Sequence, residues 1–330
     1  MTLYRDIIRR AIKSSWSNKY LWFFGLFATF FASSSLYGLF VNVISGEAAQ
    51  NPFPILSRLS TLFSLETFSN IGVVMMEDPV NVAIIMFIYL AFIVLFFFVV
   101  WLSTVSQAGI VNNAALELTE KENNLKIGLN AGIDKFWPVF SLNLFLKFVF
   151  YFGFLLISLP FIFGIFQKES LGDNLIFSIV FVFFVSLSIV FSFIIKYSIA
   201  YIVLKKKNCF SGMKSGWQLF RENWLISMEM AFLLFFIDFF INLVIILVLL
   251  VVIVPFIFMA ILIGGWGSLF GFWTLMLIAL LLFVIIAATS RAVITAFQIV
   301  AWTDLFVILT GQGGVSKLVR IAESLKRKKD

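Results

Sequence analysis

Five charged residues lie inside long apolar runs of the sequence, where a charge needs a specific partner: Lys147, Lys196, Glu229, Asp238 and Arg291. A charged side chain inside a bilayer is costly, so each is expected either to bind a substrate or to pair with another group. The first interpretation is a polar cavity in which the three cations bind an anionic headgroup or solute. The second is structural: the lysines and the arginine extend to the interface, and the two acids pair with them to hold the helices together.

Few other residues could carry chemistry. The sequence has no histidine and a single cysteine, Cys209, which excludes imidazole bases, an internal disulfide and a cysteine-based zinc cluster. No nucleophile–base pair, carboxylate dyad or metal-ligand spacing appears, so we expect no enzyme activity, no cofactor and no metal. Cys209 lies in a basic loop, where palmitoylation or a lowered thiol pKa competes with an ordinary reduced thiol. Asp238 is too short to reach the interface, which leaves a proton-coupled role open.

The composition indicates which elements must position these charges. Of the 330 residues, 62% are hydrophobic and 12% are charged, whereas soluble domains have about 45–50% and about 25%. A spanning helix needs about 20 mostly apolar residues. The sequence therefore predicts an all-α polytopic membrane protein with six transmembrane helices, over about 20–44, 80–105, 139–166, 175–204, 224–252 and 269–300. The transmembrane domain would occupy residues 1–310, and a basic amphipathic cytoplasmic tail would occupy 311–330.

The fifth apolar run continues to residue 263 and contains Pro255. Proline has no N–H to donate, so we expect the regular helix to end near Pro255 and a short interfacial piece to follow it. A functional hinge at Pro255 is the alternative. The turn to the sixth helix is expected at Gly264-Gly265-Trp266-Gly267.

Amphipathic segments with many cations lie at both ends of the chain. Before the first apolar run, apolar residues recur at helical spacing opposite four cations, which predicts a helix lying on the membrane surface. The outer loop 46–79 is expected to pack on the opposite interface. The residues expected to contact anionic lipid headgroups are Arg5, Arg9, Arg10, Lys13, Lys205, Lys206, Lys207, Lys326, Arg327, Lys328 and Lys329.

The cations also predict the orientation. Five lie before the first run, three between the second and third, five between the fourth and fifth, and six after the last. The opposite side carries only Arg58 and Lys168. The positive-inside rule then places both termini in the cytoplasm and the protein in the inner (cell) membrane. The net charge of +7 is explained by this topology and by anionic headgroups, so no nucleic-acid partner is expected.

Short sequence matches suggest an internal repeat. Lys13-Ser14-Ser15-Trp16 precedes the first span, Asn130-Ala131-Gly132-Ile133 the third and Lys214-Ser215-Gly216-Trp217 the fifth. These matches favour three helical hairpins, each an amphipathic interfacial helix followed by two spans. Because each unit has an even number of spans, the units would be related by an axis along the membrane normal.

The order of these features resembles a large, poorly characterised group of bacterial six-helix membrane proteins, which includes the membrane domain of some glycerophosphoryl diester phosphodiesterases. The resemblance rests on residues 18–26 (NKYLWFFGL), on Ser290-Arg291-Ala292 and on the stretch 217–224. We expect no counterpart of the catalytic domain of the phosphodiesterases in this sequence, because it has no histidine and no room for a soluble barrel.

We therefore predict a non-enzymatic integral membrane protein that interacts with lipids or acts as a scaffold. Its partners would be anionic membrane lipids and a possible membrane protein. The alternative is a small-solute or proton-coupled transporter that uses the intramembrane charges. A transporter should direct Lys147, Lys196, Asp238 and Arg291 into one continuous water-filled path, whereas a scaffold should hold these charges mutually paired, with no path to the outer side.

Overall fold

The computed structural model describes residues 3–32, 79–162, 171–265 and 267–311, and every element in these ranges is an α-helix. The helices are α1 (Leu3–Ser17), α2 (Tyr20–Ala32), α7 (Pro79–Leu118), α8 (Leu125–Asp134), α9 (Phe136–Ile162), α10 (Leu171–Leu204), α11 (Cys209–Glu222), α12 (Trp224–Gly265) and α13 (Leu269–Gly311). Most of the outer loop 46–79, the tail from residue 312 and the ends of the first and third expected spans lie outside the described residues.

Four of the described helices are long and apolar enough to cross a membrane: Met86–Leu118, Ser186–Leu204, Trp224–Gly265 and Leu269–Gly311. The prediction of an all-helical membrane protein is therefore confirmed. Two shorter apolar helices, Tyr20–Thr29 and Phe136–Val149, lie where the first and third spans are expected. The count of six spans stays a prediction.

The chain divides into two compact units. The first contains the described residues of Met1–Ala32, Leu102–Asn143 and Ser192–Asp330, and the second those of Ser33–Trp101 and Leu144–Phe191. In the second unit, the beginning of α7 and the middle of α10 expose large aromatic side chains such as Phe87, Phe97 and Phe183. So many exposed apolar side chains suit contact with lipid rather than with water.

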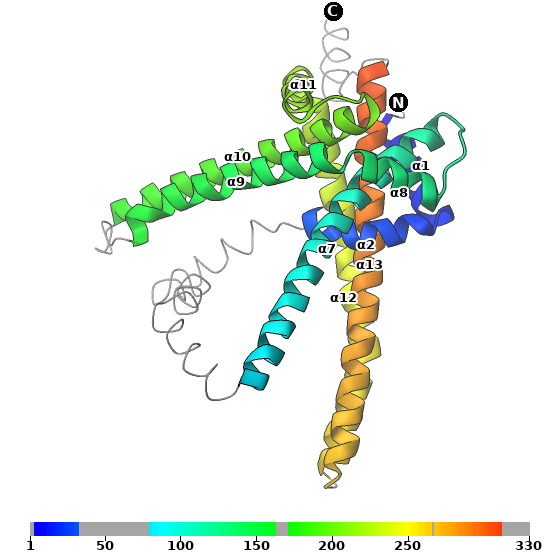
Figure 1. The fold of residues 1–330 in the computed structure, drawn as a ribbon, viewed down its shortest axis with the longest axis vertical. Coiled ribbons are helices and arrows are strands. Elements are labelled where there is room, and N and C mark those ends of the chain that lie inside the picture. Colours follow the sequence, from blue (N-terminus) through cyan, green and yellow to red (C-terminus); the bar gives the residue numbers. More distant parts are fainter. Residues whose placement is uncertain (1–2, 33–78, 163–170, 266, 312–330) are drawn as a thin grey trace, which may run out of the picture. The chain divides into compact units, whose positions relative to one another are not determined.

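The C-terminal third of α13 is the core of the first unit. Residues 300–306 of this helix are all buried, although a threonine and an aspartate are among them. Helices α1, α2 and α12 pack against α13, and α12 and α13 lie side by side in Figure 1. The contact with α2 is very close: a Cβ added to Gly25 would lie 2.0 Å from the carbonyl oxygen of Ala292.

A tight turn joins α12 to α13, where the sequence places it. The N–H of Ser268 donates to the carbonyl oxygen of Ile263 at 3.3 Å, and that of Gly267 to Gly264 at 3.0 Å. Gly267 has φ +86°, a left-handed conformation that glycine adopts without steric cost. The hydroxyl of Ser268, the residue before α13, accepts from the N–H of Gly271 in the first turn of that helix.

The expected helix end at Pro255 is wrong. Helix α12 runs from Trp224 to Gly265 with Pro255 inside it. In an apolar environment no water competes for the backbone hydrogen bonds of the neighbouring turns. A helix can therefore continue past a proline although one backbone hydrogen bond is missing there.

Helices α8 and α11 each pack on the long helix that precedes them, through two glycines spaced four apart. Gly128 and Gly132 of α8 lie against α7, where an added Cβ at Gly132 would be 2.3 Å from the carbonyl oxygen of Val105. Gly212 and Gly216 of α11 lie against α10, where an added Cβ at Gly216 would be 2.5 Å from Ser198 Oγ. These glycines therefore permit a separation that no larger residue would allow.

Helix α1 buries part of its apolar face in the protein, and its predicted position on the membrane surface stays a prediction. Tyr4, Ile7 and Ala11 are buried in the protein, where α1 packs against α13. Of the apolar residues on this helix, Ile12 and Trp16 are exposed, on the side that also carries Arg5, Arg9 and Lys13.

Candidate functional site

The five predicted intramembrane charges belong to both units of the chain. Lys147 is half-buried in the second unit, and the other four belong to the first. Arg291 is exposed on α13. The contacts of Lys196, Glu229 and Asp238 go to three different partners.

Lys196 on α10 is held by aromatic rings. Its ammonium lies 4.4 Å from the centre of the Trp302 ring and 5.9 Å from that of Phe193. The ring of Trp302 is itself buried, and the edge of Tyr197 packs against it at 6.0 Å. The negative face of the indole therefore stabilises the lysine charge, as in other cation–π contacts.

The two acids of α12 accept hydrogen bonds from neutral side chains. The hydroxyl of Tyr4 on α1 donates to Glu229 Oε2. The side-chain amide of Gln298 on α13 donates to Asp238 Oδ1 at 3.2 Å. Both bonds connect α12 to another helix, so both acids contribute to helix packing.

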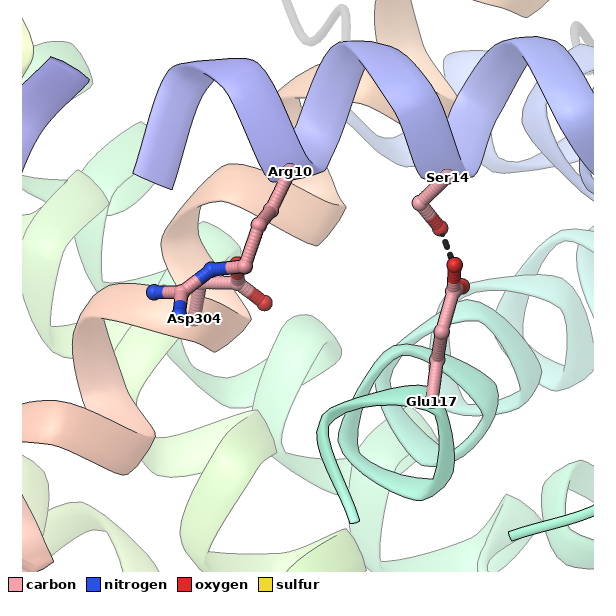
Figure 2. Close-up of polar contacts among 4 residues, drawn as sticks. All are labelled: Arg10, Ser14, Glu117 and Asp304. Carbon is pink, nitrogen blue, oxygen red and sulfur yellow. Dashed lines mark hydrogen bonds and ion pairs between the residues drawn. The ribbon is translucent and has the colours of Figure 1, made fainter. Parts of the chain in front are cut away.

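An ion pair that the sequence reasoning did not find joins the first described helix to the last. Arg10 Nε on α1 lies 3.4 Å from Asp304 Oδ2 on α13, and Figure 2 shows the guanidinium beside the carboxylate. The side chain of Arg10 is 49% exposed and that of Asp304 is 2% exposed. The acid of this pair therefore lies in the core of the first unit, and its cation, Arg10, lies at the surface of that core.

Glu117, near the C-terminus of α7, holds the other end of α1. The hydroxyl of Ser14 donates to Glu117 Oε2 at 2.5 Å, as Figure 2 shows, and the amide of Asn18 donates to the same oxygen at 3.1 Å. Three carboxylates on three helices (Glu117, Glu229 and Asp304) thus hold α1, and we call this set of contacts the α1 clamp. One signal for it was available: Asp304 is an acid within the apolar stretch 299–307.

The residues predicted to contact anionic lipid have different surroundings. Arg5, Arg9, Lys13, Lys205 and Lys206 are exposed. Arg10 is engaged by Asp304, and Lys207 Nζ donates to Ser215 Oγ at 2.6 Å and lies 4.7 Å from the ring of Tyr201. Lys326 to Lys329 lie outside the described residues.

Within the described ranges, no group of three or more Cys, Asp or Glu side chains is placed to hold a metal ion. The site therefore consists of a docked helix, several separately satisfied charges and a set of exposed cations. The resemblance to the bacterial six-helix proteins stays a prediction. No family model, no curated protein and no solved structure matches this chain.

Proposed function

We propose that this chain is a non-enzymatic six-span protein of the inner membrane, with both termini in the cytoplasm, which binds anionic lipid headgroups and acts as a scaffold. Its proposed plan is three hairpins, each with an interfacial helix. Support comes from the small residues: α8 packs on α7 through two glycines and α11 packs on α10 through two glycines. In α1, which packs on α13, the buried Ala11 and Ser15 have the same spacing.

The partners of three intramembrane charges favour the scaffold function over the transporter function. The ring of Trp302 on α13 lies against Lys196 of α10, the hydroxyl of Tyr4 on α1 donates to Glu229 of α12, and the amide of Gln298 on α13 donates to Asp238 of α12. A transport path needs ionisable groups that face a shared aqueous route. Each of these contacts joins two helices, which supports a structural role for the charges.

The outward face of α1 supports the lipid interaction. Arg5, Arg9 and Lys13 are exposed together with Ile12 and Trp16, and the opposite face is buried against the protein. Cations beside an interfacial tryptophan suit an anionic leaflet, because each cation gains attraction to the headgroups and the indole lies at their level.

Native mass spectrometry of the full chain, extracted gently from its own membrane, tests the proposal. We expect retained anionic lipid, and a partial loss of it in the double variant Arg9→Gln/Lys13→Gln. The control Lys19→Gln/Lys121→Gln removes two exposed cations elsewhere and should retain the lipid. A bare monomer without lipid or protein partner would contradict the scaffold, and solute uptake by proteoliposomes would then support the transporter.

A further inference from the structure

Helix α11 has two opposite faces of different chemistry. Gly212, Gly216 and Leu219 are buried. On the other side, spacings of four, three and four bring four exposed residues onto one stripe: Phe210, Lys214, Trp217 and Arg221. Phe210 is 70% exposed and Trp217 is 47% exposed, although both are large and apolar. We call these four residues the α11 stripe.

The glycine contacts fix the direction in which the α11 stripe points. An added Cβ at Gly212 would lie 2.8 Å from Ile202 Cγ1, and one at Gly216 would lie 2.9 Å from the backbone nitrogen of Ser198. Rotation of α11 about its axis would replace these glycines with larger side chains at the same close contact. The stripe is therefore held away from α10 by packing.

Helix α1 carries a similar stripe in the same register. In α11 a lysine lies two residues before the buried Gly216 and a tryptophan one residue after it. In α1, Lys13 and Trp16 have the same positions relative to the buried Ser15. Both helices thus expose a cation and an indole side by side, opposite a small residue that is buried.

We propose that the α11 stripe docks on the surface of an anionic phospholipid leaflet, with its two cations on the phosphates and its two aromatic rings at the headgroup level. This inference rests on the proposed function. Its charge fits such a surface, since the stripe has two cations and no acid. The nearby Glu222 lies off the stripe, and the amide of Gln218 donates to it at 2.8 Å.

Continuity with the membrane helix selects lipid over a soluble partner. Only Asn223 separates α11 from α12, a helix apolar and long enough to span a bilayer. Its first residue, Trp224, is also exposed. A helix that ends one residue before a spanning helix lies where headgroups are found, and aromatic residues are enriched at that depth.

The experiment places a bimane label beside the stripe. In the full chain, Cys209→Ser/Gln218→Cys provides one labelled cysteine on the exposed side of α11, because the sequence has no other cysteine. The labelled protein is reconstituted in nanodiscs of phosphatidylcholine, with or without phosphatidylglycerol, and a headgroup spin-labelled lipid quenches the bimane. We expect stronger quenching with phosphatidylglycerol, and a decrease of that quenching in high salt.

Two variants in the labelled background distinguish the outcomes. Lys214→Gln/Arg221→Gln should lower the quenching to the phosphatidylcholine level, whereas Lys19→Gln/Lys121→Gln should leave it high. Equal quenching in both lipids, or no effect of Lys214→Gln/Arg221→Gln in a variant with unchanged thermal unfolding, would overturn the inference. If another protein cross-links to α11 and shields the bimane from the spin-labelled lipid, the inference is also overturned. If native mass spectrometry still finds retained anionic lipid, only the α11 stripe fails; if it finds none, the proposed function fails as well.

Discussion

Arg10 and Asp304 are 294 positions apart in the sequence, and their side chains form an ion pair in which the acid is buried and the base is half exposed. The pair ties the N-terminal helix α1 to the core helix of the first unit. Because Asp304 is surrounded by buried residues of α13, its carboxylate depends on Arg10 for compensation of its charge.

Removal of Arg10 should destabilise the protein more than removal of its neighbour. Arg10→Gln leaves a carboxylate in the core without a cation, and we expect the free energy of unfolding to fall by about 2–4 kcal/mol. The exposed Arg9 is a matched control, and Arg9→Gln should change the free energy of unfolding by less than about 0.5 kcal/mol. Unfolding by SDS in detergent micelles measures both. Equal effects of the two variants would contradict the importance of the pair.

Replacement of both partners should cost less than replacement of Arg10 alone. In Arg10→Met/Asp304→Leu no charge remains in the core, so most of the lost free energy of unfolding should return. The same SDS titration compares the double variant with Arg10→Gln. A double variant that is less stable than Arg10→Gln would show that the carboxylate has another role at this position.

A methyl group at Gly25 should separate α2 from α13. Its Cβ would lie 2.0 Å from the Ala292 carbonyl oxygen, and a backbone atom cannot rotate away. We expect Gly25→Ala to lower the free energy of unfolding by about 1–3 kcal/mol. At Gly153 on α9 an added Cβ meets no atom within 4 Å. Gly153→Ala should therefore leave the stability unchanged or raise it, because alanine favours the helix.

Asp238 should be coupled energetically to Gln298 and not to Arg291. The hydrogen bond from the Gln298 amide joins α12 to α13, whereas Arg291 is exposed about two helical turns closer to the hairpin turn. In double-variant cycles, Asp238→Asn and Gln298→Leu should deviate from additivity by about 0.5 kcal/mol or more. The changes in the free energy of unfolding caused by Asp238→Asn and Arg291→Gln should be additive. Coupling to Arg291 would instead restore the buried ionic cluster that the sequence suggests.

The thiol of Cys209 should react slowly with alkylating reagents. Burial raises its pKa above the usual value for cysteine. A raised pKa means a smaller thiolate fraction at any pH below it, and the thiolate is the reactive form. Alkylation at neutral pH should therefore be slower than that of free cysteine, and its rate should rise with pH into the alkaline range. The variant Cys209→Ser gives the blank. A rate at pH 7 above that of free cysteine would indicate a pKa lowered by the nearby lysines.

The sequence predicted the features that local patterns encode. Long uncharged runs gave the helices, and Gly264 to Gly267 marked the turn, where Gly267 adopts a left-handed conformation. At Pro255 a local rule derived from helices in water gave the wrong answer, because α12 is an apolar helix that continues through the proline.

The α1 clamp could not be predicted in the same way. An amphipathic helix has the same pattern whether its apolar face meets lipid or protein, and in α1 that face meets α13. The partners of Tyr4, Arg10 and Ser14 are more than 100 positions away. Local spacing in the sequence does not encode contacts between residues so far apart, so the pattern predicts roles for the five intramembrane charges and none for Glu117 and Asp304.

The uninterrupted course of α12 has a consequence for the bilayer itself. After Asp238 this helix continues for 27 residues without a charge, which is about 40 Å against a hydrocarbon thickness of about 30 Å. The mismatch can be relieved when the paired helices α12 and α13 tilt together or when the lipid around them thickens. Infrared dichroism in oriented bilayers should therefore show a larger tilt in short-chain than in long-chain lipids, and an unchanged angle would contradict this. Membrane thickness thus becomes a variable to which this hairpin responds, and thick bilayers are the ones it fits with least distortion.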